Sequence, residues 1–216
     1  MTESLNQRSG QLAEIGREVI SALEAGHRAR EEGLANSRLT IGACGRAIRA
    51  IHRLEADRFV ALSEEAGSAL RRAQAALRPF PRIAFAGFLH DAEKEYAEAM
   101  LTSALVDGRS LANAEELGVE LPAWLNGLAE AASELRRHLL DRLREGQLER
   151  AERLLGAMED VYDLLVTVDY PDAITGGLRR TTDALRGVLE RSRADLTTAL
   201  LHYRLQRAIE AAGSSS

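Results

Sequence analysis

The sequence predicts an all-α fold, a single-domain bundle of about seven helices that ends in a long C-terminal helix. Ala, Leu, Glu and Arg dominate its 216 residues, whereas aromatic residues make up only 4% and proline occurs four times. The abundant residues are mostly strong helix formers. Apolar residues recur with the period of an α-helix along almost the whole chain, and no segment alternates as a strand does. A helical bundle is therefore the expected architecture.

Four helices are predicted in the first half of the chain from apolar residues at helical spacing. Ser37 is a plausible N-cap of the second helix. Pro79 and Pro81 mark the end of the third, because proline cannot continue a helix. The four predicted segments span residues 5–23, 41–54, 59–77 and 85–103.

The second half begins with a short helical segment over residues 110–118. Pro122 opens the fifth long helix, since proline is favoured in a first helical turn. The sequence Glu-Gly-Gln at 145–147 then separates this helix from a sixth, which is predicted over residues 150–166.

The last helix is expected to start near Asp169 as its cap, with Pro171 in its first turn, and to run to about Ala212. At ~1.5 Å per residue such a helix outruns a compact domain of this size. We therefore expect its excess apolar seam to pack against another subunit. The predicted organisation is one domain over residues 1–212, followed by a disordered tail over residues 213–216.

Charge and cysteine content limit the classes of function. The net charge of −5 gives no general attraction for nucleic acid or anionic lipid, so any anion must bind at local basic clusters. Cys44 is alone, which excludes an intrachain disulfide and fits a reducing compartment. We find no signal sequence and no apolar run of membrane-spanning length, so we expect a cytoplasmic protein without a membrane partner. A phosphate loop, a dinucleotide fingerprint and a nucleophile elbow are also missing.

Two flanks of acidic residues are the strongest candidate site. Glu95 lies at the edge of the apolar stripe of its helix, and Glu98 lies on the same flank. The next long helix repeats this arrangement with Glu130 and Glu134. If the two helices pack antiparallel, the carboxylates face each other, and they repel unless they are protonated or bind a cation. Such a set of hard oxygen ligands favours Mg²⁺ or Mn²⁺. On helical-wheel geometry alone, ordinary solvated acids are the commoner explanation.

Basic residues gather on the second predicted helix. Arg46, Arg49 and Arg53 share the face opposite its apolar stripe, so they could follow the backbone of a nucleic acid. A solvated face whose arginines pair with neighbouring glutamates is the commoner origin of a cluster of this size.

The chain resembles the translin family, and the resemblance extends over nearly its whole length. It is carried by IRAIHRLE at 48–55, EYAEA at 95–99, WLNGLAEAASEL at 124–135 and VDYPDAITGGLRRTTDALR at 168–186. The resemblance implies an all-α bundle that assembles into hollow closed oligomers and binds single-stranded RNA or DNA. Here a homo-oligomer is implied, between a hexamer and an octamer.

Within the family the chain is closest to the catalytic type, called translin-associated factor X. Members of that type are Mg²⁺-dependent endoribonucleases that use a Glu-x-x-Glu pair and an acid on a later helix. The pair matches Glu95 and Glu98, and the later acid matches Glu130, with Glu134 one turn on as a fourth candidate. The eukaryotic pattern of the family has Asp where this chain has Glu130.

The resulting hypothesis is a homo-oligomeric endoribonuclease that cleaves single-stranded RNA. Glu95, Glu98 and Glu130 would hold Mg²⁺ or Mn²⁺, Glu134 would assist catalysis, and the three arginines would hold the RNA backbone. The alternative is a translin-type protein that binds single-stranded RNA or DNA without cleaving it. A third possibility is a purely structural helical oligomer with solvated acids.

Overall fold

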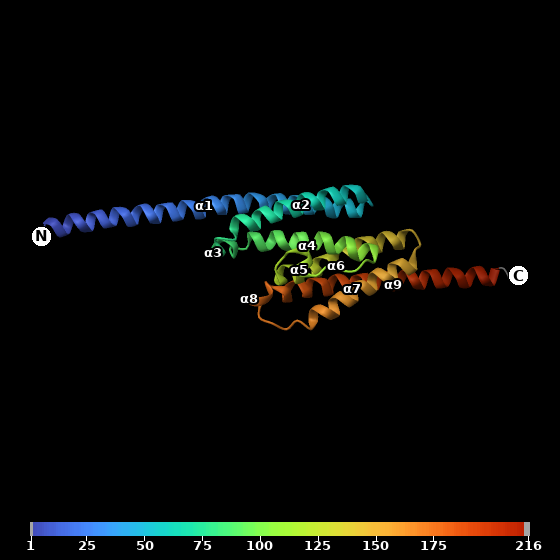
Figure 1. Cartoon of the computed structure of the whole chain (residues 1–216). Helices are drawn as coiled ribbons and strands as arrows, with labels where there is room; N and C mark the ends of the chain where they lie inside the picture. Colours follow the sequence, from blue (N-terminus) through green and yellow to red (C-terminus); the bar gives the residue numbers. More distant parts are fainter. Residues whose placement is uncertain (1, 214–216) are drawn as a thin grey trace.

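A computed structural model describes residues 2–213 of the chain. In this part of the chain there are nine helices and no strand, which confirms the all-α prediction (Figure 1). The helices are α1 (Thr2–His52), α2 (Ala56–Leu77), α3 (Pro81–Ala84), α4 (Phe88–Asp107), α5 (Ala114–Leu117), α6 (Leu121–Arg144), α7 (Leu148–Val166), α8 (Asp172–Thr175) and α9 (Leu178–Gly213). None of them is long and apolar enough to cross a membrane.

The long helices pack side by side, with α1 between α2 and α4. The C-terminal half of α1 forms an antiparallel pair with α2, and α4 packs against α1 and, on its other side, against α6. Helix α6 also contacts α7 and α9, so it is the central helix of the bundle. The start of α1 and the end of α9 extend beyond the bundle at opposite ends (Figure 1).

Helix α1 corrects the prediction of two separate N-terminal helices. It runs unbroken for 51 residues, so residues 24–40 between the two predicted segments, with Gly26 and Gly33 among them, are helical as well. A helical glycine costs only about 1 kcal/mol, which packing can offset. At Gly33 a Cβ atom would come within 2.7 Å of the Leu77 side chain, so glycine allows α1 and α2 to approach closely. Ser37, the predicted N-cap, is instead buried inside α1.

The predicted last helix is two helices. Gly176 and Gly177 have φ values of 62° and 84°, a left-handed conformation that glycine adopts without strain, and they separate α8 from α9. Pro171, not Asp169, occupies the N-cap position of α8. Helix α9 still has 36 residues and is the long C-terminal helix that the sequence predicts. It includes Gly213, the first residue of the predicted tail, and residues 214–216 lie outside the described residues.

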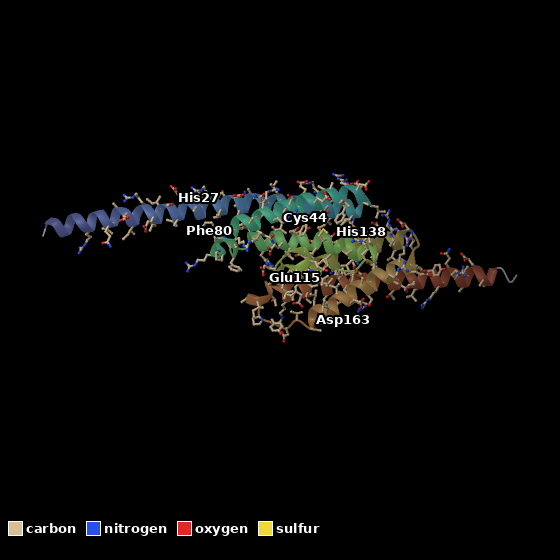
Figure 2. All side chains as sticks on the ribbon, in the orientation of Figure 1. His27, Cys44, Phe80, Glu115, His138 and Asp163 are labelled. Atoms are coloured by element: carbon tan, nitrogen blue, oxygen red, sulfur yellow. The ribbon has the colours of Figure 1, made fainter. Side chains whose placement is uncertain are left out.

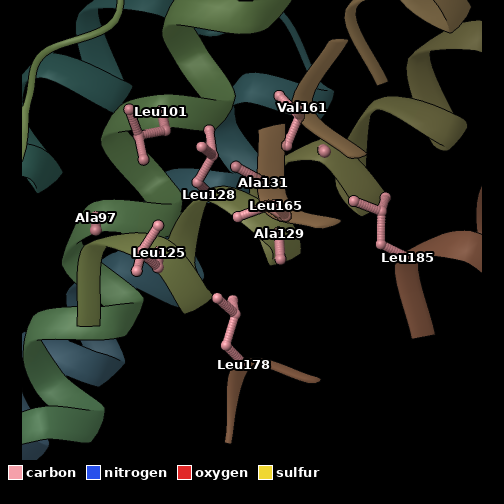
Figure 3. Packing of buried hydrophobic residues seen from close by; sticks show 11 residues of the cluster. Ala97, Leu101, Leu125, Leu128, Ala129, Ala131, Val161, Leu165, Leu178 and Leu185 are labelled. Atoms are coloured by element: carbon pink, nitrogen blue, oxygen red, sulfur yellow. The ribbon is translucent and has the colours of Figure 1, made fainter. Parts of the chain in front are cut away.

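The largest apolar core lies between α4, α6, α7 and α9. Leu101 of α4, Leu128 of α6, Leu165 of α7 and Leu185 of α9 meet there (Figure 3). A second cluster continues the core along α6, α7 and α9, and a third joins α1, α2 and α4 through small residues such as Ala43, Ala47 and Ala99. Because α4 and α6 contribute to the same core, the relative position of their backbones is fixed.

Gly127 sets the distance between α4 and α6. A Cβ atom at this position would lie 2.7 Å from the backbone oxygen of Lys94, 2.8 Å from the Ala97 Cβ and 2.9 Å from the Glu98 nitrogen. Contacts this short with backbone atoms cannot be relieved by a side-chain rotation. Only glycine therefore permits this approach of the two helices.

We expect Gly127→Ala to lower the free energy of unfolding by about 1–3 kcal/mol, the usual cost of overpacking. Gly156→Ala on α7 is the matched control, because a Cβ there has open space. It should stabilise the protein by about 0.5–1 kcal/mol through helix propensity. Urea unfolding monitored by circular dichroism measures both changes. Equal stabilisation by the two substitutions would show that α4 and α6 do not approach as described.

Candidate metal centre

Helices α4 and α6 bring three of the predicted acidic residues together. Glu95 and Glu98 lie one turn apart on α4, and Glu130 lies on α6. One carboxylate oxygen from each of these three residues lies within 4.8 Å of the other two. This is close enough for one cation to contact all three carboxylates. Glu134 follows one turn after Glu130 on the same helix.

Glu98 is the most deeply buried of these carboxyl groups. It is 8% exposed, whereas Glu95 and Glu130 are half-buried. Loss of solvent raises the pKa of Glu98 to about 9, with further contributions from the negative charges of Glu130, Glu95 and Glu134. Burial also raises the pKa of Glu95. The group of acids is therefore under electrostatic strain that a bound cation would relieve.

Lys94 supplies a positive charge at this cluster. Its Nζ donates a hydrogen bond to Oε1 of Glu130 at 2.8 Å, and it lies 2.7 Å from Oε2 of the same carboxylate and 3.5 Å from Oε1 of Glu95. Burial by itself would lower the pKa of Lys94, but the hydrogen bond to Glu130 and the charge of Glu130 outweigh it and raise the pKa. The sequence reasoning missed this contact, although Lys94 directly precedes Glu95.

A pair of histidines extends from Glu134, and one of them contacts its carboxylate. His52 Nε2 is hydrogen-bonded to Glu134 Oε2, at 2.7 Å. His52 Nδ1 is in turn hydrogen-bonded to His138 Nε2, at 3.1 Å. Burial, together with the smaller effect of the nearby His52, lowers the pKa of His138 to about 4. His138 lies toward the end of the bundle where α1 turns into α2 (Figure 2). This contact links the end of α1 to the acidic cluster.

The predicted arginine cluster is only partly on one helix. Arg46 and Arg49 lie on α1, but Arg53 lies in the turn that follows it, because α1 ends at His52. The side chains of Arg49 and Arg53 are exposed, whereas Arg46 is paired with Glu65 of α2 at 2.7 Å. The ion pair between Arg46 and Glu65 is the arginine–glutamate pairing that the sequence analysis gave as the commoner alternative. Arg49 and Arg53 stand on either side of His52 in the chain, so they lie at the end of α1 that reaches the acids.

The donor set fits a hard divalent cation. The three convergent groups are carboxylates, which Mg²⁺ and Mn²⁺ prefer, and the described residues bring no cysteine into the cluster. The carboxylates come from two rigid helices whose spacing is fixed by Gly127. Sequence periodicity predicted the participants, but it could not predict that Lys94 pairs with Glu130 or that His52 reaches Glu134 from α1.

The solved structures give the family. A chain of AfC3PO, solved in complex with duplex RNA, is 33% identical to this chain with a TM-score of 0.79, and the match covers 86% of this chain and 96% of that one. The chain belongs to the translin family, since C3PO is of the translin type. A second structure, a crystal structure of AfC3PO, is 32% identical, again with a TM-score of 0.79, over 86% of this chain and 97% of that one.

One curated protein and one further solved structure also resemble the chain. An uncharacterized protein of Methanocaldococcus jannaschii is 30% identical over 190 residues, which are 87% of this chain and 84% of that protein. Apo-NeC3PO has the same fold with a TM-score of 0.77, over 85% of this chain and 96% of that one, at 18% identity. No protein-family model matches the chain.

Proposed function

We propose that this member of the translin family is of the factor-X type, a metal-dependent endoribonuclease that cleaves single-stranded RNA as a homo-oligomer. The observation that carries the proposal is the convergence of Glu95, Glu98 and Glu130 from two helices. The similarity to an AfC3PO chain that was solved with duplex RNA supports RNA as the class of substrate.

In this proposal Glu95, Glu98 and Glu130 hold Mg²⁺ or Mn²⁺. Such a cation lowers the pKa of a bound water and neutralises the charge that develops on a phosphodiester. Glu134 assists as the proton acceptor: His52 occupies its Oε2, which leaves Oε1 free to take a proton from the attacking water. The exposed side chains of Arg49 and Arg53 hold the RNA backbone, and Arg46 joins them when it releases Glu65.

Incubation of the purified protein with a labelled single-stranded RNA tests this function. Cleavage is expected with Mg²⁺ or Mn²⁺ and none with EDTA. A single-stranded DNA and an RNA duplex of the same sequence, run in parallel, identify the preferred substrate. Cleavage that is insensitive to EDTA would contradict the metal mechanism, and an RNA that is neither bound nor cleaved would favour a structural role.

A non-catalytic translin-type binding protein is the second candidate. The observation that favours it is the ion pair between Lys94 and Glu130, which gives the acids a cation without any metal. This candidate predicts salt-dependent binding of single-stranded RNA or DNA that EDTA does not change, with an intact substrate after long incubation.

Self-assembly is supported by the two ends of the chain that extend from the bundle. Near the start, α1 exposes an apolar stripe whose members include Leu12, Val19 and Leu23, and His27 lies near the point where α1 meets the bundle (Figure 2). Helix α9 exposes Leu201, Leu205 and Ile209 at four-residue spacing. Contiguous apolar surface of this kind marks a protein interface. We infer that these stripes are buried between subunits of a homo-oligomer, between a hexamer and an octamer.

We expect the triple substitution of Leu12, Val19 and Leu23 by glutamine to reduce the assembly to smaller species. Glutamine retains helix propensity, so the helix should persist while its apolar contact area is lost. Sedimentation velocity gives the masses of the wild type and the variant. The same substitution at exposed Glu14, Arg17 and Glu18 is the control. A wild type that sediments as a monomer would contradict the inference.

A further inference from the structure

Lys94 is the only lysine in the chain, because the other 27 of its 28 basic residues are arginines. This single lysine lies directly before Glu95 on α4. The side chain of Lys94 is 21% exposed, and its charge is directed at the acidic cluster rather than at solvent.

The ammonium group of Lys94 lies on the oxygens that a metal ion would need. It contacts both carboxylate oxygens of Glu130 and lies 3.5 Å from Glu95, two of the three groups that converge at the candidate site. A divalent cation that contacts Glu95 and Glu130 would come within a few ångströms of this ammonium. Two positive charges at that distance repel strongly in a half-buried environment. Glu130 therefore cannot bind the Lys94 ammonium and a divalent cation together without weakening both interactions.

The identity of the basic residue suits an exchange of cations. An arginine would hold Glu130 through two parallel hydrogen bonds in a fixed planar geometry. A lysine is a point charge on a flexible four-carbon stem, so it can leave one carboxylate and turn toward solvent without unfolding the helix. With 21% of the side chain already exposed, a path to solvent is open.

We propose that Lys94 is a built-in competitor of the divalent cation: its ammonium neutralises Glu130 in the metal-free site and is displaced when the metal binds, so that Lys94 lowers the metal affinity of the site. The proposal rests on the metal site of the proposed function. It assigns to Lys94 the tuning of cation affinity, and not a contact with the reacting atoms.

Removal of the competing charge is the first test. Isothermal titration with Mn²⁺ should show that Lys94→Met binds the ion at least about tenfold more tightly than the wild type, since a repulsive charge has been removed. Lys94→Arg should bind it more weakly, because the guanidinium holds Glu130 through two bonds. Arg142→Met on α6 is the matched control: Arg142 pairs with Glu145 at 3.0 Å and is similarly buried, at 18% exposure, but it lies outside the cluster. It should leave the Mn²⁺ affinity unchanged.

The second test observes Lys94 directly. Because the chain has one lysine, an amine-reactive acetylating reagent can modify only Lys94 and the α-amino group, and mass spectrometry separates the two. Release from Glu130 should increase the labelling of Lys94 several-fold at saturating Mg²⁺, while the α-amino group serves as the internal reference.

The outcomes separate the role of Lys94 from the metal site itself. If wild type and Lys94→Met bind Mn²⁺ with equal affinity, or if Mg²⁺ leaves the labelling of Lys94 unchanged, Lys94 is not a competitor, although the metal site stands. If neither protein binds Mn²⁺ while circular dichroism shows both to be folded, the metal site fails and the role of Lys94 fails with it.

Discussion

Replacing Glu98 with glutamine is expected to reduce metal-dependent RNA cleavage by more than about 100-fold. Changes to the partners of a metal ligand already cost about 10–100-fold, and Glu98 is proposed as a ligand itself. Glutamine has the shape of a protonated glutamic acid, and the raised pKa of Glu98 shows that its buried environment favours the protonated form. The variant should therefore fold normally, so that a loss of cleavage reports on chemistry and not on stability.

Glu93→Gln is the matched control for this substitution. Glu93 is also buried on α4, and burial raises its pKa, but it contacts Gln74 and the backbone of Glu120 on another side of the helix. It should retain most of the cleavage and the metal requirement of the wild type. Initial rates at several Mg²⁺ concentrations give the comparison. Comparable losses in the two variants would contradict a specific role for Glu98.

The stability of the metal-free protein is expected to fall as the pH rises above neutrality. The pKa of Glu98 is raised from 4.5 to about 9 in the folded chain. Between these two values the folded protein binds a proton that the unfolded chain has lost. The contribution of Glu98 is therefore fully present below pH 4.5 and is lost progressively as the pH rises toward 9, by up to about 1.4 kcal/mol per pH unit.

Urea unfolding in EDTA at pH 6.5 and pH 8 measures this effect, and we expect a loss of about 2 kcal/mol across the interval. Glu98→Gln should remove most of that loss, because the amide cannot ionise. Saturating Mg²⁺ should also remove it in the wild type, since a bound cation stabilises the ionised carboxylates. A wild type whose stability is the same at both pH values would show that Glu98 is not under the strain described.

On the acidic side the opposite sign applies to His138. Its pKa is lowered from 6.5 to about 4 in the folded chain, so the unfolded chain takes up a proton first as the pH falls below 6.5. The contribution of His138 is thus lost between pH 6.5 and 4. Between about pH 4.5 and 6.5 the opposite slopes of Glu98 and His138 offset each other, so these two groups leave the stability of the metal-free protein nearly constant there and lower it above about pH 6.5.

The sequence predicted the architecture and the acidic residues because both depend on local periodicity. Apolar spacing of 3.6 residues identified most long helices, and the same geometry placed Glu95 and Glu98 on one flank. The predicted gap between residues 23 and 41 was wrong because glycines that pack against other helices, such as Gly26 and Gly33, can remain helical. The opposite happened at Gly176 and Gly177, where positive φ values end α8.

The details of the site depended on tertiary contacts that no local pattern contains. His52 reaches Glu134 across 82 positions of the chain, and Lys94 reaches Glu130 across 36. Helical-wheel geometry predicted that acids could face each other, but it treated neighbouring basic residues as part of a solvated surface. Only the packing of α4 on α6, at the distance set by Gly127, shows that a lysine lies between the carboxylates.

The central claim is that Glu95, Glu98 and Glu130 together bind a divalent cation. A crystal of the protein soaked in Mn²⁺ and measured by anomalous diffraction tests it most directly. We predict an anomalous peak about 2.1 Å from an oxygen of each of the three carboxylates, the distance typical of Mg²⁺-like ions, with the Lys94 ammonium moved away from Glu130. The absence of a peak between α4 and α6 at saturating Mn²⁺ would contradict the claim.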